Sequence, residues 1–223
     1  MRKYTVSDLV KEVKVVIDRN QENAELIPDD TDTLSQGEII EGVIVDAVRI
    51  IEENAPTHLL AGRNLISLLS PTFTQIGDTY KVTIALPTDL MRLLTIQMSD
   101  WDRPAEIITS DDDEYKLQHC KYSGVRGNMH KPIAALVQSS AGDLELELFS
   151  CNSNKATIKK GTYLTMPTIL NGTIEICEKL KDAVVYMAAY LTCISLGDLQ
   201  TASGFKATAY QLAGIVEQPS QTE

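Results

Sequence analysis

The chain has 223 residues, of which 43% are hydrophobic and 23% charged, a composition typical of a globular protein that excludes disordered, collagen-like and coiled-coil chains. Its 20 basic and 31 acidic side chains give a net charge of −11, which argues against a protein that grips nucleic-acid phosphates or adsorbs to an anionic membrane. Residues 1–60 alone hold 6 basic and 13 acidic side chains, so the excess of negative charge gathers near one end.

The first predicted elements are two helices. Apolar residues recur at helical spacing over about 7–19 and about 35–54. Ser35 and Glu38 have the spacing of a capping box at the start of the second helix, and residues 20–34 form a polar connection before it. The chain starts without the apolar segment of a secretory signal, so its four cysteines are expected to be free thiols.

Alternation of apolar and polar residues predicts strands through the middle of the chain. We expect strands near 80–86, 93–98, 132–138, 144–149 and 156–166. Turn residues at 139–143 predict a hairpin between two of them. Antiparallel pairing is expected, because no helical crossover separates these runs.

Helical spacing returns near the end of the chain. Ile174–Leu196 is expected to form one long helix, and Leu199–Ala213 a final helix that ends at Gly214. The buried side of the final helix is predicted to hold Ala202, Phe205, Ala209, Leu212 and Ala213.

The predicted fold class is α+β. A helical bundle formed by the N- and C-terminal helices would carry an inserted antiparallel β-rich lobe. The predicted divisions are the N-terminal helices of the bundle at 1–60, the β-rich inserted lobe at 61–170, a C-terminal helical hairpin at 171–216 and a polar tail at 217–223.

The motifs that could carry chemistry are weak. Phosphate-binding loops, the nucleophile motif of hydrolases and the zinc-protease motif are absent from the sequence. The acidic run Asp111–Glu114 is either a calcium or magnesium loop or a solvated loop, and the second is favoured because adjacent Asp side chains do not converge. Two other combinations are weaker still. One is a zinc site from His119, Cys120, His130 and Cys151. The other is a pair of carboxylates among Asp143, Glu145 and Glu147, where the alternation of Glu with Leu favours a strand with a solvated face. We expect no catalytic residue, no cofactor and no metal.

A basic segment follows the acidic run. Residues 115–131 contain Lys116, Lys121, Arg126 and Lys131 and no acidic residue. This segment either makes an electrostatic contact, with an acidic neighbour or with phosphate, or is a basic surface offset by the acidic run before it.

One element and the order of the parts point to a family. Leu86–Leu93 follows a predicted strand and reads Leu-Pro-Thr-Asp-Leu-Met-Arg-Leu, a Leu-Pro-x-Asp-x-x-Arg-Leu element. The chain closes with an alanine-rich helix pair that contains Ala183–Leu191, Leu199–Ser203 and Tyr210–Leu212. In this order the chain resembles the head-to-tail connector, or adaptor (head-completion) ring, proteins of short-tailed and crAss-like phages. It departs from them in a long middle, 100–168, and in the connection 20–34.

The resemblance implies a structural virion protein and not an enzyme. Such a protein is a subunit of a ring of about twelve copies below the portal, which extends the DNA channel and provides the tail docking surface. Its partners would be the portal protein, the tail or further ring proteins, and other copies of itself. DNA would pass through without specific binding, and no membrane would be involved. It would reside at the head–tail interface of the virion, and in the host cytoplasm during assembly.

Two alternatives stay open. The chain is another phage assembly protein, such as a tail-completion or baseplate ring protein, or, less expected, a cell-wall hydrolase. The candidate contacts to subunits or partners are Lys116, Lys121, Arg126, Lys131, Asp198, Phe205, Lys206 and Tyr210.

Overall fold

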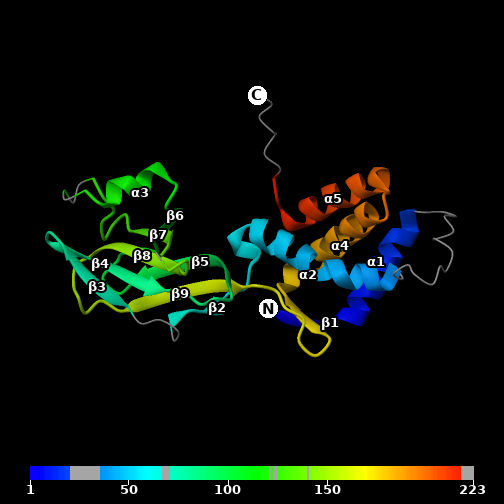
Figure 1. Cartoon of the computed structure of the whole chain (residues 1–223), viewed down its shortest axis with the longest axis horizontal. Helices are drawn as coiled ribbons and strands as arrows, with labels where there is room; N and C mark the ends of the chain where they lie inside the picture. Colours follow the sequence, from blue (N-terminus) through cyan, green and yellow to red (C-terminus); the bar gives the residue numbers. More distant parts are fainter. Residues whose placement is uncertain (21–35, 67–70, 121, 123–124, 140, 217–223) are drawn as a thin grey trace, which may run out of the picture. The chain divides into compact units, whose positions relative to one another are not determined.

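The chain divides into two compact units. The computed structural model describes residues 1–20, 36–66, 71–120, 122, 125–139 and 141–216. The first unit, here called the helical unit, comprises Met1–Ala61 and Met166–Glu223, and the second, the β unit, comprises Gly62–Thr165 (Figure 1). The β unit is therefore inserted into the sequence of the helical unit. Ser35, Lys121 and the tail 217–223, which figure in the sequence predictions, lie outside the described residues.

Four α-helices build most of the helical unit. They are α1 (Val6–Asn20), α2 (Gln36–Asn54), α4 (Lys181–Ser195) and α5 (Leu199–Ala213), with short 3-10 turns at Thr57–Leu59 and Glu178–Leu180. Helix α4 packs against the other three, which explains its nearly unbroken apolar sequence. Helix α5 ends as predicted, at Gly214 with a φ of 65°, a left-handed conformation that favours glycine.

The helical unit also contains a two-stranded antiparallel sheet. Its strands are β1 (Arg2–Thr5) and β10 (Thr173–Ile176). The long helix predicted from Ile174 is wrong over its first residues, since α4 begins only at Lys181. Ile174 and Ile176 are both buried and alternate with polar neighbours, a pattern with the period of a strand.

Two sheets form the β unit. The smaller sheet has the order β2 (Arg63–Asn64), β9 (Ile158–Thr165), β5 (Leu90–Met98). The larger has the order β3 (Thr72–Ile76), β4 (Thr79–Ala85), β8 (Leu144–Cys151), β7 (Ile133–Gln138), β6 (Glu106–Thr109). Every described pair is antiparallel except β6 with β7, which run parallel because the 110–132 connection carries the chain back to the same end.

The larger sheet is covered on both faces. Val82, Leu146 and Leu148 on one face share a core with Leu93 and Ile96 of the smaller sheet. The opposite face carries a second core, against which Tyr115 of the short helix α3 (Asp113–Gln118) packs; its buried members are Ile108, Ile133, Ala135, Val137 and Phe149. Helix α3 thus lies over the second face, where the sequence predicted only a solvated acidic loop.

The predicted fold class is therefore wrong. The chain is mixed α and β, and its described strands, β1 to β10, belong to three sheets that occur in both units. A division into a bundle of terminal helices and an antiparallel lobe describes neither the β1–β10 pair nor the parallel β6–β7 pair. The prediction failed because short strands such as β1, β6 and β10 are too brief to show a clear period.

Candidate functional site

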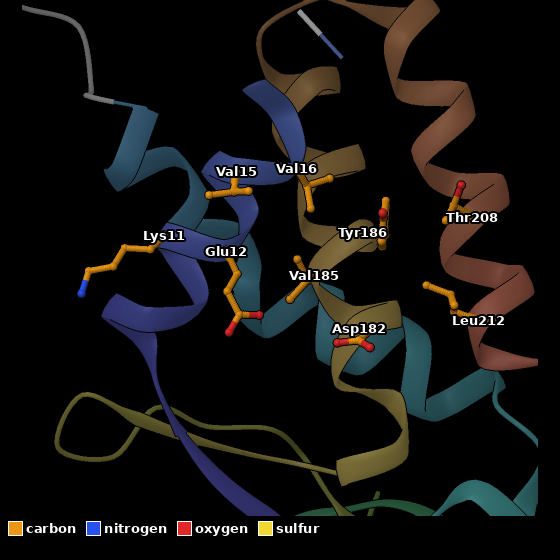
Figure 2. Close-up of a pocket in the computed structure, with 9 residues that line it drawn as sticks. All are labelled: Lys11, Glu12, Val15, Val16, Asp182, Val185, Tyr186, Thr208 and Leu212. Atoms are coloured by element: carbon orange, nitrogen blue, oxygen red, sulfur yellow. The ribbon is translucent and has the colours of Figure 1, made fainter. Parts of the chain in front are cut away.

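An apolar groove crosses the surface of the helical unit. It lies between α1 and α5, with α4 as its floor, and has a volume of about 520 Å³ (Figure 2). Its apolar lining comes from three helices and comprises Val15, Val16, Val185, Tyr186 and Leu212. The groove exists because α4 packs against both outer helices and leaves its side between them uncovered.

The two rims of the groove expose large apolar side chains. Val15 on α1 is 50% exposed, and Leu212 on α5 is 46% exposed. The sequence pattern placed Leu212 on the buried side of the final helix, so this part of the prediction is wrong. Apolar side chains gathered around a hollow are typical of a surface that receives another protein element.

Charged residues border one end of the groove. Lys11 and Glu12 lie on α1 and Asp182 lies on α4. Glu12 forms an ion pair with Lys181, at the first residue of α4, which ties the two helices together below the groove. The site thus has an apolar centre and a polar edge, the arrangement of protein interfaces.

The predicted contacts of the final helix occupy different environments. The Asp198 carboxylate accepts a hydrogen bond from the Thr201 amide at 3.1 Å and caps α5. Phe205 is buried and lies with its ring centroid 6.3 Å from that of Tyr186. The Lys206 ammonium lies 5.1 Å from the centroid of the half-buried Tyr210 ring. Three of the four, Asp198, Lys206 and Tyr210, thus keep part of their surface open to solvent.

The basic segment does not form one exposed surface. Lys116 is exposed and paired with Asp113 on its own helix, with 2.9 Å between Nζ and Oδ1. Arg126 is buried, whereas Lys131 is exposed. These residues divide between surface and interior because the chain folds back against the larger sheet at Arg126 and Gly127.

The acidic run serves the local fold. The Asp112 carboxylate accepts hydrogen bonds from the Thr109 amide at 2.7 Å and hydroxyl at 3.0 Å. These bonds hold the pKa of Asp112 below its usual value. Within the described part of the chain, no three His, Cys, Asp or Glu side chains gather as a metal site would require.

The residues considered for zinc binding are apart. His119 stacks edge-on against Tyr115 and Phe149, while the His130 ring Nδ1 is in hydrogen-bond contact with the Asp102 carboxylate. Cys151 is buried, and burial raises its pKa to about 12. The four cysteines are free thiols, as expected, and Cys120 is the half-buried one among them.

Glu147 is held by two side chains, Lys81 and Tyr115, that the sequence pattern did not predict as its partners. It is 9% exposed, where the alternation with Leu predicted a solvated strand face. Its carboxylate lies 2.8 Å from Lys81 Nζ and accepts a hydrogen bond from the Tyr115 hydroxyl at 3.1 Å. This network links β4, β8 and α3 on the second face of the larger sheet.

One buried carboxyl was missed by sequence reasoning. Glu52 of α2 is fully buried, and its Oε1 accepts a hydrogen bond from the Cys177 amide at 2.6 Å. Burial raises the pKa of Glu52. Its position could have revealed it, because Glu52 continues the spacing of Ile44 and Val48 on the buried stripe of α2.

Of the helices that the structure describes, none combines the length and hydropathy of a membrane span. Neither a protein-family model nor a curated protein matches the sequence.

Proposed function

We propose that this protein is a structural subunit of a phage head-to-tail connector, which joins other copies in a ring below the portal. The observation that carries the proposal is the open apolar groove between α1 and α5. A structural subunit needs such a surface to receive a neighbour, and an apolar hollow of about 520 Å³ is large enough for several side chains of an incoming element.

The sequence supports the same role. The Leu-Pro-x-Asp-x-x-Arg-Leu element over 86–93 and the alanine-rich helices at the end resemble the adaptor ring proteins. The net charge of −11 also suits a conduit, because an acidic wall repels the phosphates of DNA that must pass. The ring of about twelve copies and the docking of a tail belong to the proposal and follow from the resemblance alone.

The experiment is a mass measurement by light scattering, on the chain alone and mixed with the portal protein of the same phage. The expected result is a complex in which the number of added chains matches the portal symmetry. A small oligomer indifferent to the portal would overturn the proposal and favour a tail-completion or baseplate ring protein. Zymography on purified cell wall would then test the hydrolase alternative.

A pair of variants on one helix tests the groove itself. Leu212→Gln changes an apolar rim residue, and Leu199→Gln changes an apolar residue of α5, 68% exposed, that does not line the groove. Full burial of an exposed leucine stabilises by about 1.5–3 kcal/mol. Leu212 has 46% of its surface left to bury, so Leu212→Gln should weaken assembly about three- to tenfold. Leu199→Gln should leave assembly unchanged. Equal effects of the two variants would show that the groove is not the surface through which the subunits assemble.

A further inference from the structure

Arg126 is a charged residue in the interior of the β unit. It is 5% exposed, and its Nη2 donates a hydrogen bond of 3.1 Å to the Ile76 carbonyl, at the tip of the β3–β4 hairpin. Its Nε is buried and has no hydrogen-bond partner. Across the described residues, the guanidinium forms no ion pair with a carboxylate. A buried cation without a counter-charge is unfavourable, so an anion placed beside the guanidinium would stabilise the site.

The backbone next to Arg126 is held in place by buried side chains. The Gly127 amide donates a hydrogen bond of 2.7 Å to Gln118 Oε1, and the Ser150 hydroxyl donates to the Gly127 carbonyl. A Cβ at position 127 would lie 3.1 Å from the side chain of Ile133, so glycine permits this close approach. The guanidinium therefore projects from a fixed backbone and is oriented before any ligand arrives.

A small cavity opens beside this guanidinium. Its volume is about 240 Å³, and Arg126 contributes to its wall. Lys131 adds a second cation, Asn128 and Gln118 add amide groups, and Glu114 contributes one carboxylate. The polar side chains of the lining are thus two cations, two neutral amides and one acid, and the apolar ones are Leu117, Val125 and Ile133.

We infer that this cavity binds a single oxyanion, a carboxylate or a phosphate, between Arg126 and Lys131. A guanidinium presents planar donors that match the oxygens of either group, and the free Nε is one of those donors. The ammonium of Lys131 supplies the charge that Arg126 alone does not provide. The inference is independent of the ring proposal, which rests on the helical unit.

Two sources could supply the oxyanion. One is an acidic side chain of another copy, since each chain carries 31 Asp and Glu residues. The other is free phosphate. Both present the same oxygens to the guanidinium, so binding and self-association have to be measured separately.

The test is an NMR titration of the full chain with inorganic phosphate and with acetate, at an ionic strength kept constant with chloride. Saturable shifts of the Arg126, Gly127 and Lys131 amides are expected with at least one of the two anions. Lys131→Gln should weaken binding about tenfold, since it removes one charged donor. Glu114→Gln should tighten it, because it removes the one acid on the wall. Lys159→Gln, an exposed lysine on β9, serves as the charge-matched control and should leave binding unchanged.

Arg126→Met is the decisive variant. It should abolish the response to both anions, and without anion it should be at least as stable as the wild type, because an unpaired buried cation is gone. Should this variant fail to fold, the opposite shifts of Lys131→Gln and Glu114→Gln decide the matter. The inference is overturned if neither anion shifts the wild-type amides more than chloride does. It is also overturned if a folded Arg126→Met keeps the response, or if Lys131→Gln and Glu114→Gln both leave binding unchanged.

Sedimentation equilibrium then identifies the source of the anion. Self-association that phosphate disrupts and Arg126→Met abolishes would assign the cavity to a carboxylate of a second copy. Phosphate binding with no change in mass would assign it to the free anion.

Discussion

The two candidate sites, one in each unit, differ in chemistry. In the helical unit, the ion pairs lie at the surface, as Arg2 with Glu178 and Lys11 with Asp8 do, while large apolar side chains border an open groove. In the β unit, Lys81 pairs with Glu147 under α3 and Arg126 is buried against the β3–β4 hairpin, while Lys116 and Asp113 form an exposed pair. The helical unit thus leaves an apolar surface uncovered, and the β unit leaves a buried cation without a carboxylate partner among the described residues.

The groove of the helical unit would be covered by an apolar element, whereas the cavity of the β unit would be filled by an anion. Apolar contact is non-directional and roughly proportional to area, so a groove accepts many shapes of partner. A buried guanidinium binds an anion most strongly when its N–H groups reach the anion's oxygens at hydrogen-bond distance, so this site selects a partner by charge and not by shape. The predictions below test both sides of this comparison, in order of expected effect.

The largest effect is expected from the core of the helical unit. Phe205→Ala removes a buried ring between α5 and α4 and should lower the free energy of unfolding by about 3–5 kcal/mol. Urea denaturation followed by circular dichroism measures it. Leu199→Ala, on the exposed side of the same helix, should stay within about 0.5 kcal/mol of the wild type. A loss below about 1 kcal/mol for Phe205→Ala would mean that this residue is available to a partner instead of holding the unit together.

The buried charges of the β unit should show a smaller loss that a second change reverses. Lys81→Met leaves Glu147 without its cation and should lower the free energy of unfolding by about 2–3 kcal/mol. This value is at the low end for a buried ion pair, because the two side chains are still 20% and 11% exposed. Adding Glu147→Leu should recover most of that loss, although the Tyr115 hydroxyl then loses its acceptor. Denaturation of the single and double variants checks this, and strictly additive losses would contradict a coupled pair.

Glu52 makes the stability of the helical unit depend on pH. Burial raises its pKa in the folded state above the ordinary 4.5, so the folded chain binds the proton more tightly than the unfolded chain. Its contribution is therefore fully present below pH 4.5 and is lost as the pH rises through the folded pKa. Glu52→Gln should flatten this decline, because the amide of glutamine does not titrate in this pH range.

Thermal unfolding across this pH range compares Glu52→Gln with Glu41→Gln, which changes an exposed residue of the same helix. The Glu41 variant should follow the wild-type curve. A Glu52→Gln curve that falls as steeply as that of the wild type would assign the pH dependence to other groups.

The smallest effect is expected at a surface ion pair of the β unit. Lys116 and Asp113 are 74% and 96% exposed, so solvent screens their attraction. Lys116→Gln should change the free energy of unfolding by less than about 0.5 kcal/mol in the same urea assay. A larger loss would mean that exposed and buried charges contribute alike, and the contrast between the units would fail.

Sequence patterns correctly predicted the helices and strands whose apolar residues recur regularly over the whole element. Residues 79–85 alternate over a full strand, and the final helix shows both its apolar spacing and its glycine stop, so β4 and α5 lie where they were expected. Four-residue strands such as β10 carry too little pattern, and the helical signal of α4 extended over it. The parallel β6–β7 pair depends on contacts that no local pattern contains.

The sequence predicted part of one candidate site, the cavity beside Arg126, and missed the other, the groove between α1 and α5. The basic residues Arg126 and Lys131 were singled out by their charge. The burial of Arg126 depends on tertiary contacts, namely its own hydrogen bond to the Ile76 carbonyl and those of the neighbouring Gly127 with Gln118 and Ser150. The groove was missed, because Leu212 fits the spacing of the buried face of α5 and is exposed only where α1 and α5 stand apart over α4.

The insertion of the β unit into the helical unit sets an order of events during synthesis. Helix α2 leaves the ribosome with its apolar face complete, but α4, against which that face packs, is encoded after the whole of Gly62–Thr165. At about 5–20 residues per second, the gap is on the order of ten seconds. Through that interval the apolar face of α2 that α4 will cover stays exposed in the nascent chain. The β unit, in contrast, is a single continuous segment and can fold as soon as it has been synthesised. Ribosome-associated chaperones would meet α1 and α2 before α4 is made, and slowing translation within Gly62–Thr165 would lengthen the period in which the chain needs them.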